Sequence, residues 1–263
     1  MSHQYTDEEI IRVILEQRRQ RRRKMMRRRR IAALLVLSLL ILGGCGAFRA
    51  LHHTGDSPDK TKNAATAKTV KIRGTVFIDA GHGGNDPGAQ ALNRTEKDDT
   101  LRLALAVRSA LKKRGLQAEM SRTDDTAVDR AKRGEIANRK GANLFVSLHR
   151  NKASQGQGVE IWIPSDDPKD SRLLAENIMK ELKSAGITEN RGIRTGTLPD
   201  PKDDYQENKT PDMPSCLIEF GFISDETDNR LFDEKLNTYG KALAKAIDHT
   251  YQSLYETQGG TND

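Results

Sequence analysis

The sequence predicts a single α/β domain with a largely parallel central sheet flanked by helices, preceded by an N-terminal membrane segment. From Gly74 onward, strand-like runs alternate with helix-like stretches for about 180 residues, a pattern typical of α/β proteins. Leu144–Leu148 is almost continuously apolar, which is typical of a strand covered on both faces. Ile31–Phe48 carries no charge and follows an arginine-rich block, which is typical of a membrane segment.

The basic charge of this 263-residue chain is confined to one short block. The formal net charge is +7, from 44 Lys and Arg against 37 Asp and Glu. Residues 18–30 hold ten Lys or Arg and no acid, whereas the chain from Ile31 onward is neutral overall. A neutral, aromatic-poor domain lacks the basic surface that nucleic-acid binding requires, so the sequence predicts no nucleic-acid partner. The position of the block, just before an apolar run, indicates membrane topology instead.

Residues 31–50 are predicted to be a transmembrane or signal segment, with the basic lead 1–30 in the cytoplasm. The 18 uncharged residues are near the lower length limit of a membrane-spanning helix, and positive charge on their amino side keeps that side in the cytoplasm. Two alternatives stay open: lipidation at Cys45, which ends a lipobox-like Leu-Gly-Gly-Cys, or cleavage after a small residue such as Ala47. All three interpretations place the following domain outside the cytoplasmic membrane. The favoured interpretation is an anchor that is retained, so the membrane is a predicted partner.

The rest of the chain divides into a polar linker at 51–73, a globular domain at 74–256 and a polar tail at 257–263. The two cysteines, Cys45 and Cys216, give no disulfide framework. The stretch 187–214 shows no periodicity, so no helix or strand is predicted there. Elsewhere in the domain the pattern predicts strands at 75–78, 117–121, 144–148, 158–163 and 215–219, and helices at 97–114, 128–140, 171–185 and 237–255.

The first predicted strand runs directly into a glycine-rich turn that carries His82. Val76–Ala89 reads Val-Phe-Ile-Asp-Ala-Gly-His-Gly-Gly-Asn-Asp-Pro-Gly-Ala. A turn at the carboxyl end of a strand is where α/β proteins tend to hold their sites, although an incidental surface histidine is the alternative. The glycines are expected to allow positive φ and tight bends that other residues resist, at Gly81, Gly83, Gly84 and Gly88.

Polar residues also stand at other strand ends. His149 follows Leu144–Leu148, Glu219 ends the last predicted strand, and Glu96 lies at the start of the first predicted helix. Because the carboxyl ends of parallel strands share one edge, these groups and His82 could converge. Two histidines and a carboxylate form a common catalytic zinc set, with a further glutamate as general base.

Each of these residues also has a simpler interpretation. A single histidine is more often structural, and Glu96 alone suits a helix N-terminus, where the macrodipole favours a carboxylate. Glu219 is harder to explain in this way, because a buried strand has little reason to hold an acid unless it is paired or used. From spacing alone, therefore, a zinc site is one of several interpretations.

The globular domain contains, in this order, the specific motifs Asp-Ala-Gly-His-Gly-Gly, Glu-Lys-Asp, Ser-Leu-His-Arg-Asn and Glu-Phe-Gly-Phe-Ile-Ser. Taken together, these motifs and the segments around them resemble the zinc-dependent N-acetylmuramoyl-L-alanine amidases of bacterial cell walls. The family fold is a single α/β domain with a twisted central sheet, which agrees with the predicted elements. The resembling segments, which follow the family's order, are Val76–Ala89, Thr95–Asp98, Met120–Asp124, Arg133–Asn151 and Met213–Ser224.

This resemblance implies that His82, Glu96 and His149 bind one zinc ion (Zn²⁺) and that Glu219 is the catalytic glutamate. The implied reaction is hydrolysis of the amide between the lactyl group of N-acetylmuramic acid and the L-alanine of the stem peptide. Zinc-activated water is the implied nucleophile, Glu219 moves its proton, and the glycan strand and stem peptide of peptidoglycan are the implied partners. A zinc peptidase acting on another amide, or a catalytically silent wall-binding or regulatory relative, are the alternatives.

Some residues depart from the family pattern or have open roles. Arg150 replaces a small residue, so it either engages an acidic stem-peptide group or points outward. Asn151 either orients a metal ligand or is a strand-end turn residue, while Arg122 is expected to be structural and His249 an ordinary surface or core histidine. Some relatives carry a helix that plugs the site. The lack of a helical pattern in 187–214 predicts open access, and the need for a protein activator stays open.

Overall fold

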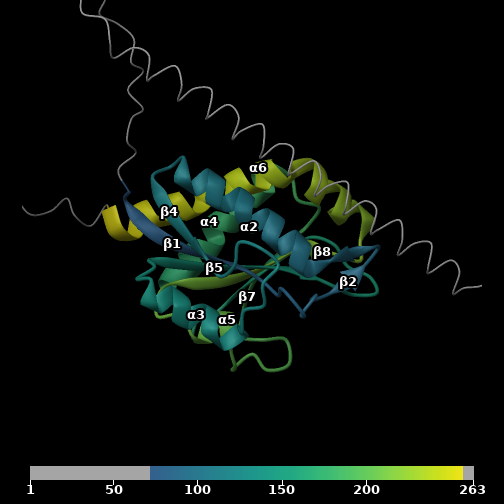
Figure 1. The fold of residues 1–263 in the computed structure, drawn as a ribbon, viewed down its shortest axis with the longest axis horizontal. Helices are drawn as coiled ribbons and strands as arrows, with labels where there is room; N and C mark the ends of the chain where they lie inside the picture. The colour runs from purple at the N-terminus through teal and green to yellow at the C-terminus, as the bar shows by residue number, and fades with distance from the viewer. Residues whose placement is uncertain (1–71, 257–263) are drawn as a thin grey trace, which may run out of the picture. The chain divides into compact units, whose positions relative to one another are not determined.

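The computed structural model describes residues 72–256, in which helices cover both faces of a six-stranded sheet (Figure 1). The strand order is β4-β1-β5-β8-β6-β7, and a separate two-stranded hairpin, β2 and β3, follows the turn after β1. The strands are β1 (Gly74–Ala80), β2 (Gln90–Ala91), β3 (Arg94–Thr95), β4 (Leu116–Met120), β5 (Leu144–Asn151), β6 (Val159–Ile163), β7 (Asn190–Thr195) and β8 (Ser215–Phe222).

The direction of the strands places several chain segments at one edge of the sheet. Strands β4, β1, β5 and β8 are mutually parallel, whereas β6 pairs antiparallel with β8 and β7 pairs parallel with β6. The predicted, largely parallel α/β sheet is thereby confirmed, with two strands reversed. The carboxyl ends of β1, β5 and β8 lie together, and His149 on β5 stands directly opposite Glu219 on β8.

Long helices cover one face of the sheet and shorter ones the other (Figure 1). Helices α2 (Glu96–Lys112) and α4 (Lys169–Ala185) each pack on α6 (Glu226–Tyr251), and all three cover the first face. Helices α3 (Arg130–Arg139) and α5 (Gln206–Lys209) pack together on the opposite face. A π-helical turn, Gln252–Glu256, ends the described chain.

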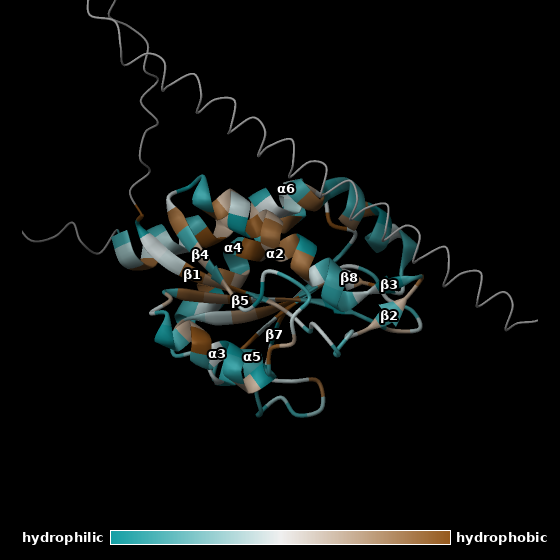
Figure 2. Ribbon diagram, in the orientation of Figure 1, coloured by the Kyte–Doolittle hydropathy of each residue, from teal (hydrophilic) through white to brown (hydrophobic). Residues whose placement is uncertain are grey.

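The two faces of the sheet bury different side chains. On the three-helix face, aliphatic strand residues such as Ile78, Val146 and Ile218 form the main core with the helices. On the other face, the rings of Phe77 and Phe145 stack at 5.6 Å in a smaller cluster. Figure 2 shows hydrophobic residues along the strands and hydrophobic patches alternating with hydrophilic ones along α2. The smaller cluster leaves the rest of that face free for the polar side chains of the strand ends.

Several helix ends follow from local sequence. The Asp129 side chain accepts hydrogen bonds from the amides of Ala131 and Lys132 and so caps α3. Helix α4 ends at Gly186, which adopts the left-handed conformation with φ of 81°. The prediction that the last helix begins at Asn237 is wrong, because α6 begins at Glu226.

The first turns of α6 show no hydrophobic periodicity in the sequence because the residues that they bury are polar. Asp228 accepts hydrogen bonds from the amides of Gly158 and Phe222, and the Asn229 amide donates to the carbonyl of Ile223. The stretch 187–214, expected to hold no regular structure, contains β7 and α5. Both are too short for hydrophobic periodicity to identify them.

The predicted lead 1–30, membrane or signal segment 31–50 and most of the linker lie outside the described residues, as does the tail 257–263. These assignments therefore stay predictions. Within residues 72–256, no helix combines the length and apolar character needed to cross a bilayer.

Candidate functional site

The turn after β1 is shaped by contact with the neighbouring strand. His82 itself adopts positive φ, at 60°, as do Gly83, Gly84 and Gly88. Gly81 does not, so its expected role in a left-handed turn is wrong. A Cβ atom on Gly81 would lie 2.5 Å from the ring of His149, so the absence of a side chain there lets β1 and β5 bring their histidines together.

Two buried arginines hold this turn in place. Arg133 donates to the carbonyl oxygens of Ala80 and His82, and its Nη1 forms an ion pair of 2.7 Å with Asp79 Oδ1. Arg122 donates to the carbonyl oxygens of Ala80 and Gly81, among others. The expected structural role of Arg122 is thus confirmed. A backbone fixed by so many donors stabilises the strained conformation of His82.

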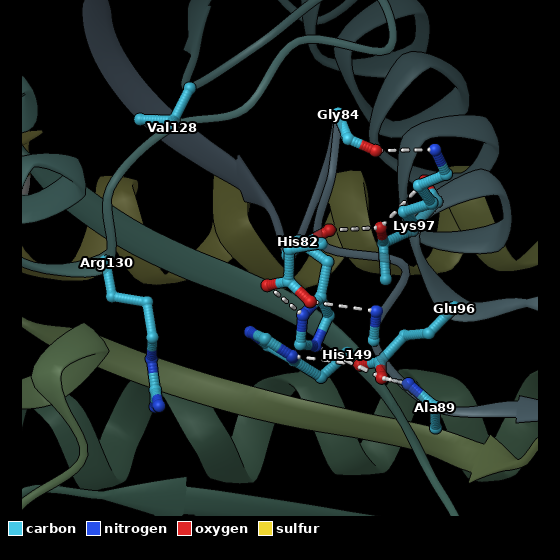
Figure 3. A network of polar contacts seen from close by, with 12 residues as sticks. His82, Gly84, Ala89, Glu96, Lys97, Val128, Arg130 and His149 are labelled. Atoms are coloured by element: carbon cyan, nitrogen blue, oxygen red, sulfur yellow. Dashed lines mark hydrogen bonds and ion pairs between the residues drawn. The ribbon is translucent and has the colours of Figure 1, made fainter.

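The carboxylate of Glu96 lies beside the two imidazole rings and contacts each of them through one oxygen (Figure 3). Its Oε2 is 3.1 Å from His82 Nε2, and its Oε1 is 3.0 Å from His149 Nδ1. Glu96 is the first residue of α2, and its oxygens also accept hydrogen bonds from the amides of Ala89 and Arg150. Four donors thus fix the orientation of this one carboxylate.

The ionisation of this cluster suits a bound cation. Burial acts to raise the pKa of Glu96, but the hydrogen bonds and charges of His149 and His82 outweigh it and hold that pKa well below its usual value. Burial likewise acts to lower the pKa of His149, yet its hydrogen bond to Glu96 and the surrounding carboxylates raise it to about 9. The cluster therefore favours positive charge beside the Glu96 carboxylate, and a metal ion bound there would take the place of the imidazole protons.

The donor set fits zinc. One ligand atom each from His82, Glu96 and His149 lies within 4.8 Å of the other two. Tetrahedral zinc with bonds of 2.0–2.1 Å needs its ligand atoms about 3.3 Å apart, close to the 3.0 and 3.1 Å observed between Glu96 and the rings. His82 Nδ1 lies 2.7 Å from Asp86 Oδ2, which fixes the tautomer that leaves Nε2 free for a metal.

Glu219 lies beside this cluster with an unpaired oxygen. Among the described residues, the buried side-chain polar atoms without a hydrogen-bond partner are Arg133 Nε, His149 Nε2 and Glu219 Oε2. Burial raises the pKa of Glu219 to about 7, with Glu96 and Glu160 adding to that rise and His149 opposing it. A carboxyl group with a pKa near neutrality and a free oxygen can both accept and donate a proton.

Glu207 is a site residue that the sequence pattern did not reveal. It lies on the four-residue helix α5, is 1% exposed, and places Oε1 3.9 Å from His149 Nε2. Arg130 holds its carboxylate with two hydrogen bonds of 3.2 Å. The prediction of no helix in 187–214 is wrong, because α5 lies there, whereas open access to the site stays a prediction. Because α5 has a single turn, no periodic signal marks Glu207 as buried.

The structure assigns Arg150 to neither of its two expected positions. It does not point outward, because it is 2% exposed, and its guanidinium is bonded to protein side chains and is not free to engage a stem peptide. Its guanidinium bonds the side chains of Asp99 at 2.6 Å and Asn229 at 2.7 Å, and lies 4.5 Å from the ring centre of Phe232. Arg150 therefore links β5 to α2 and α6 through buried polar contacts, at a position where the family usually has a small residue.

The other residues with open roles take simple positions. Asn151 donates to Glu160 Oε1 at 3.0 Å and not to a metal ligand. His249 is exposed on α6, as an ordinary surface histidine would be. Cys216 is fully buried in β8, where burial raises the pKa of its thiol.

Comparison with known proteins places this fold and site in one family. Residues 76–249 match the family described as N-acetylmuramoyl-L-alanine amidase. The uncharacterized protein YqiI of Bacillus subtilis is 35% identical over 185 residues, which cover 69% of this chain and 85% of that protein. The probable cell wall amidase LytH of Staphylococcus aureus is 31% identical over 185 residues, covering 68% of this chain but only 56% of LytH.

A solved structure gives the same result. The N-acetylmuramoyl-L-alanine amidase AmiC2 of Nostoc punctiforme superposes with a TM-score of 0.59 at 31% identity. The superposition covers 68% of this chain and 97% of that structure. This chain is an enzyme of the N-acetylmuramoyl-L-alanine amidase family.

Proposed function

We propose that this protein is a zinc-dependent peptidoglycan amidase that cleaves the bond between the lactyl group of N-acetylmuramic acid and the L-alanine of the stem peptide. The observation that carries the proposal is the cluster of His82, Glu96 and His149, with the unpaired carboxyl oxygen of Glu219 beside it. Three ligands from the protein leave a fourth position on zinc, which is the arrangement of catalytic rather than structural sites.

In this reaction, Glu219 transfers the proton and Asp86 orients a metal-binding histidine. When bound, zinc supplies Lewis acidity, which lowers the pKa of water and polarises the amide carbonyl. Glu219 Oε2, which has no competing hydrogen bond, takes the proton from the attacking water. The same oxygen then delivers that proton to the nitrogen of the departing L-alanine. Asp86 holds the ring of His82 throughout.

Digestion of purified peptidoglycan tests the substrate bond and the metal together. We expect the full chain to release new amino-terminal L-alanine, and a zinc chelator to abolish this release until zinc is added back. The measurement is amino-terminal labelling of the digest. New reducing sugar ends, or new amino termini from bonds within the stem peptide, would contradict the proposal and favour another hydrolase. No cleavage with zinc present would favour a silent relative.

Replacing Glu207 by glutamine is expected to weaken zinc binding by about tenfold or less, because the Glu207 carboxylate lies 3.9 Å from His149 Nε2 and acts on the ring through its charge, without a hydrogen bond. The negative charge of Glu207 raises the basicity of the His149 imidazole. Competition with a fluorescent chelator measures the affinity without any need for turnover. Glu135→Gln, an exposed glutamate on α3, is the matched control. Equal affinities for the two variants would exclude this role for Glu207.

A further inference from the structure

A row of charged side chains crosses the sheet from the metal cluster toward its β7 edge. In the strand register, His149 on β5 lies opposite Glu219 on β8, and Glu219 lies opposite Glu160 on β6. Residues directly opposite each other on neighbouring strands present their side chains on the same face. Glu160 is therefore the next side chain beyond Glu219, and it is 3% exposed.

The last strand of the row, β7, adds two arginines. Arg191 Nε lies 3.1 Å and Arg194 Nε 3.4 Å from the same oxygen, Glu160 Oε2. Two residues three positions apart on a regular strand point to opposite faces. Here the pairing between β6 and β7 shifts register, and Gly192 adopts a φ of 94°. This irregularity turns both guanidinium groups toward Glu160.

The arginines are held firmly yet stay accessible to solvent. The side chain of Arg191 is 29% exposed and lies 5.0 Å from the ring centre of Phe222, while that of Arg194 is 42% exposed and lies 5.6 Å from the ring centre of Trp162. Stacking on aromatic rings limits the orientations of each guanidinium.

The charges of this group do not balance. Glu160 Oε1 accepts hydrogen bonds from the side chains of Asn151 and Trp162, so only Oε2 forms ion pairs with the two arginines. Within residues 72–256, no other carboxylate forms an ion pair with either arginine. Within the group of Arg191, Arg194 and Glu160, one negative charge between two positive charges leaves one unit of positive charge, on guanidinium groups that present further donors.

We propose that Arg191 and Arg194 form a subsite that binds a carboxylate of the stem peptide and sets the enzyme's preference for acidic stems. This subsite rests on the proposed amidase function. Strands β8 and β7 are two strand spacings apart, about 10 Å. An extended peptide advances about 3.3–3.6 Å per residue, so the second or third stem residue reaches the arginines when the scissile amide lies at Glu219. Planar guanidinium groups match a carboxylate with two parallel hydrogen bonds.

The test compares two substrates that differ only in charge: muramoyl-L-alanyl-D-glutamate and its diamide, which carries no carboxylate. For the wild-type protein we expect a higher kcat/KM on the acid, and we expect Arg194→Gln to lower the acid-to-diamide ratio about tenfold, mainly through KM. Arg194→Lys, which keeps the charge, is expected to restore part of the ratio. A ratio of one in the wild type, or an unchanged ratio in Arg194→Gln, would overturn the subsite.

A binding experiment separates this proposal from the function on which it rests. The same two compounds are titrated into Glu219→Gln and into Glu219→Gln/Arg194→Gln, with dissociation constants read by NMR up to the millimolar range. We expect tighter binding of the acid only when Arg194 is present. If the wild type cleaves neither compound but this difference remains, the amidase proposal fails and the subsite stands. Equal binding of both compounds, or none, refutes the subsite. Arg230→Gln, an exposed arginine on α6, is the control.

Discussion

Replacing Glu219 by glutamine is expected to lower kcat about 10²–10⁴-fold while zinc remains bound, because the amide cannot take a proton from water. Glu219 lies next to the metal cluster but is not one of its three candidate ligands. The measurement pairs release of amino-terminal L-alanine with the zinc content of the purified variant. Retained activity would contradict the assigned role, and loss of zinc would instead make Glu219 a ligand.

The same variant is expected to be more stable than the wild type at alkaline pH. Burial raises the folded-state pKa of Glu219 to about 7, above the usual value of a glutamate, so folding is opposed by its charge once the pH exceeds that pKa. In the metal-free protein, Glu219→Gln should gain roughly 3 kcal/mol at pH 8 and almost nothing at pH 4. Urea unfolding at both pH values measures this difference.

The pH profile of activity follows from the same group. As the general base, Glu219 must be deprotonated, so kcat/KM should fall about tenfold per unit as the pH drops below its pKa. Bound zinc favours the carboxylate, which places this acid limb at or below pH 7. Glu135→Gln, on exposed α3, controls for the loss of a surface charge and should match the wild type in activity and stability. A control that behaved like Glu219→Gln would make these effects non-specific.

Replacing Asp79 by alanine is expected to destabilise the fold by about 3–5 kcal/mol, because it leaves Arg133 buried without its counter-ion. Asp79 is fully buried and bonds Arg133 and Ser147, each at 2.7 Å. Burial acts to raise the pKa of Asp79, but the charge of Arg133 outweighs it and lowers that pKa. The resulting stability is present above the unfolded pKa, near pH 4, and is lost as the pH falls through the folded pKa.

Thermal and urea unfolding measure this effect, and a double variant identifies its cause. Asp79→Ala/Arg133→Met removes both charges, so it should be less destabilised than the sum of the losses in Asp79→Ala and in Arg133→Met. Strictly additive losses would show that the ion pair is not the source. Because Arg133 also donates to the carbonyl of His82, we expect Asp79→Ala to weaken zinc binding as well.

The sequence predicted the elements whose patterns are local. The apolar run Leu144–Leu148 lies inside β5, the spacing in 171–185 predicts most of α4, and Gly186 ends that helix as expected. The prediction was less accurate where tertiary contacts replace hydrophobic periodicity. The first turns of α6 bury Asp228 and Asn229 against other elements, and their polar character concealed the helix.

The sequence by itself predicted the α/β class and named His82, Glu96, His149 and Glu219 as candidate site residues, because these residues lie in motifs a few residues long. Only the tertiary structure decided which other side chains join them. Glu207 reaches His149 from a one-turn helix, and Arg150 turns inward to Asp99. Such contacts depend on strand register and on chain segments more than fifty residues apart, for which a linear pattern carries no signal.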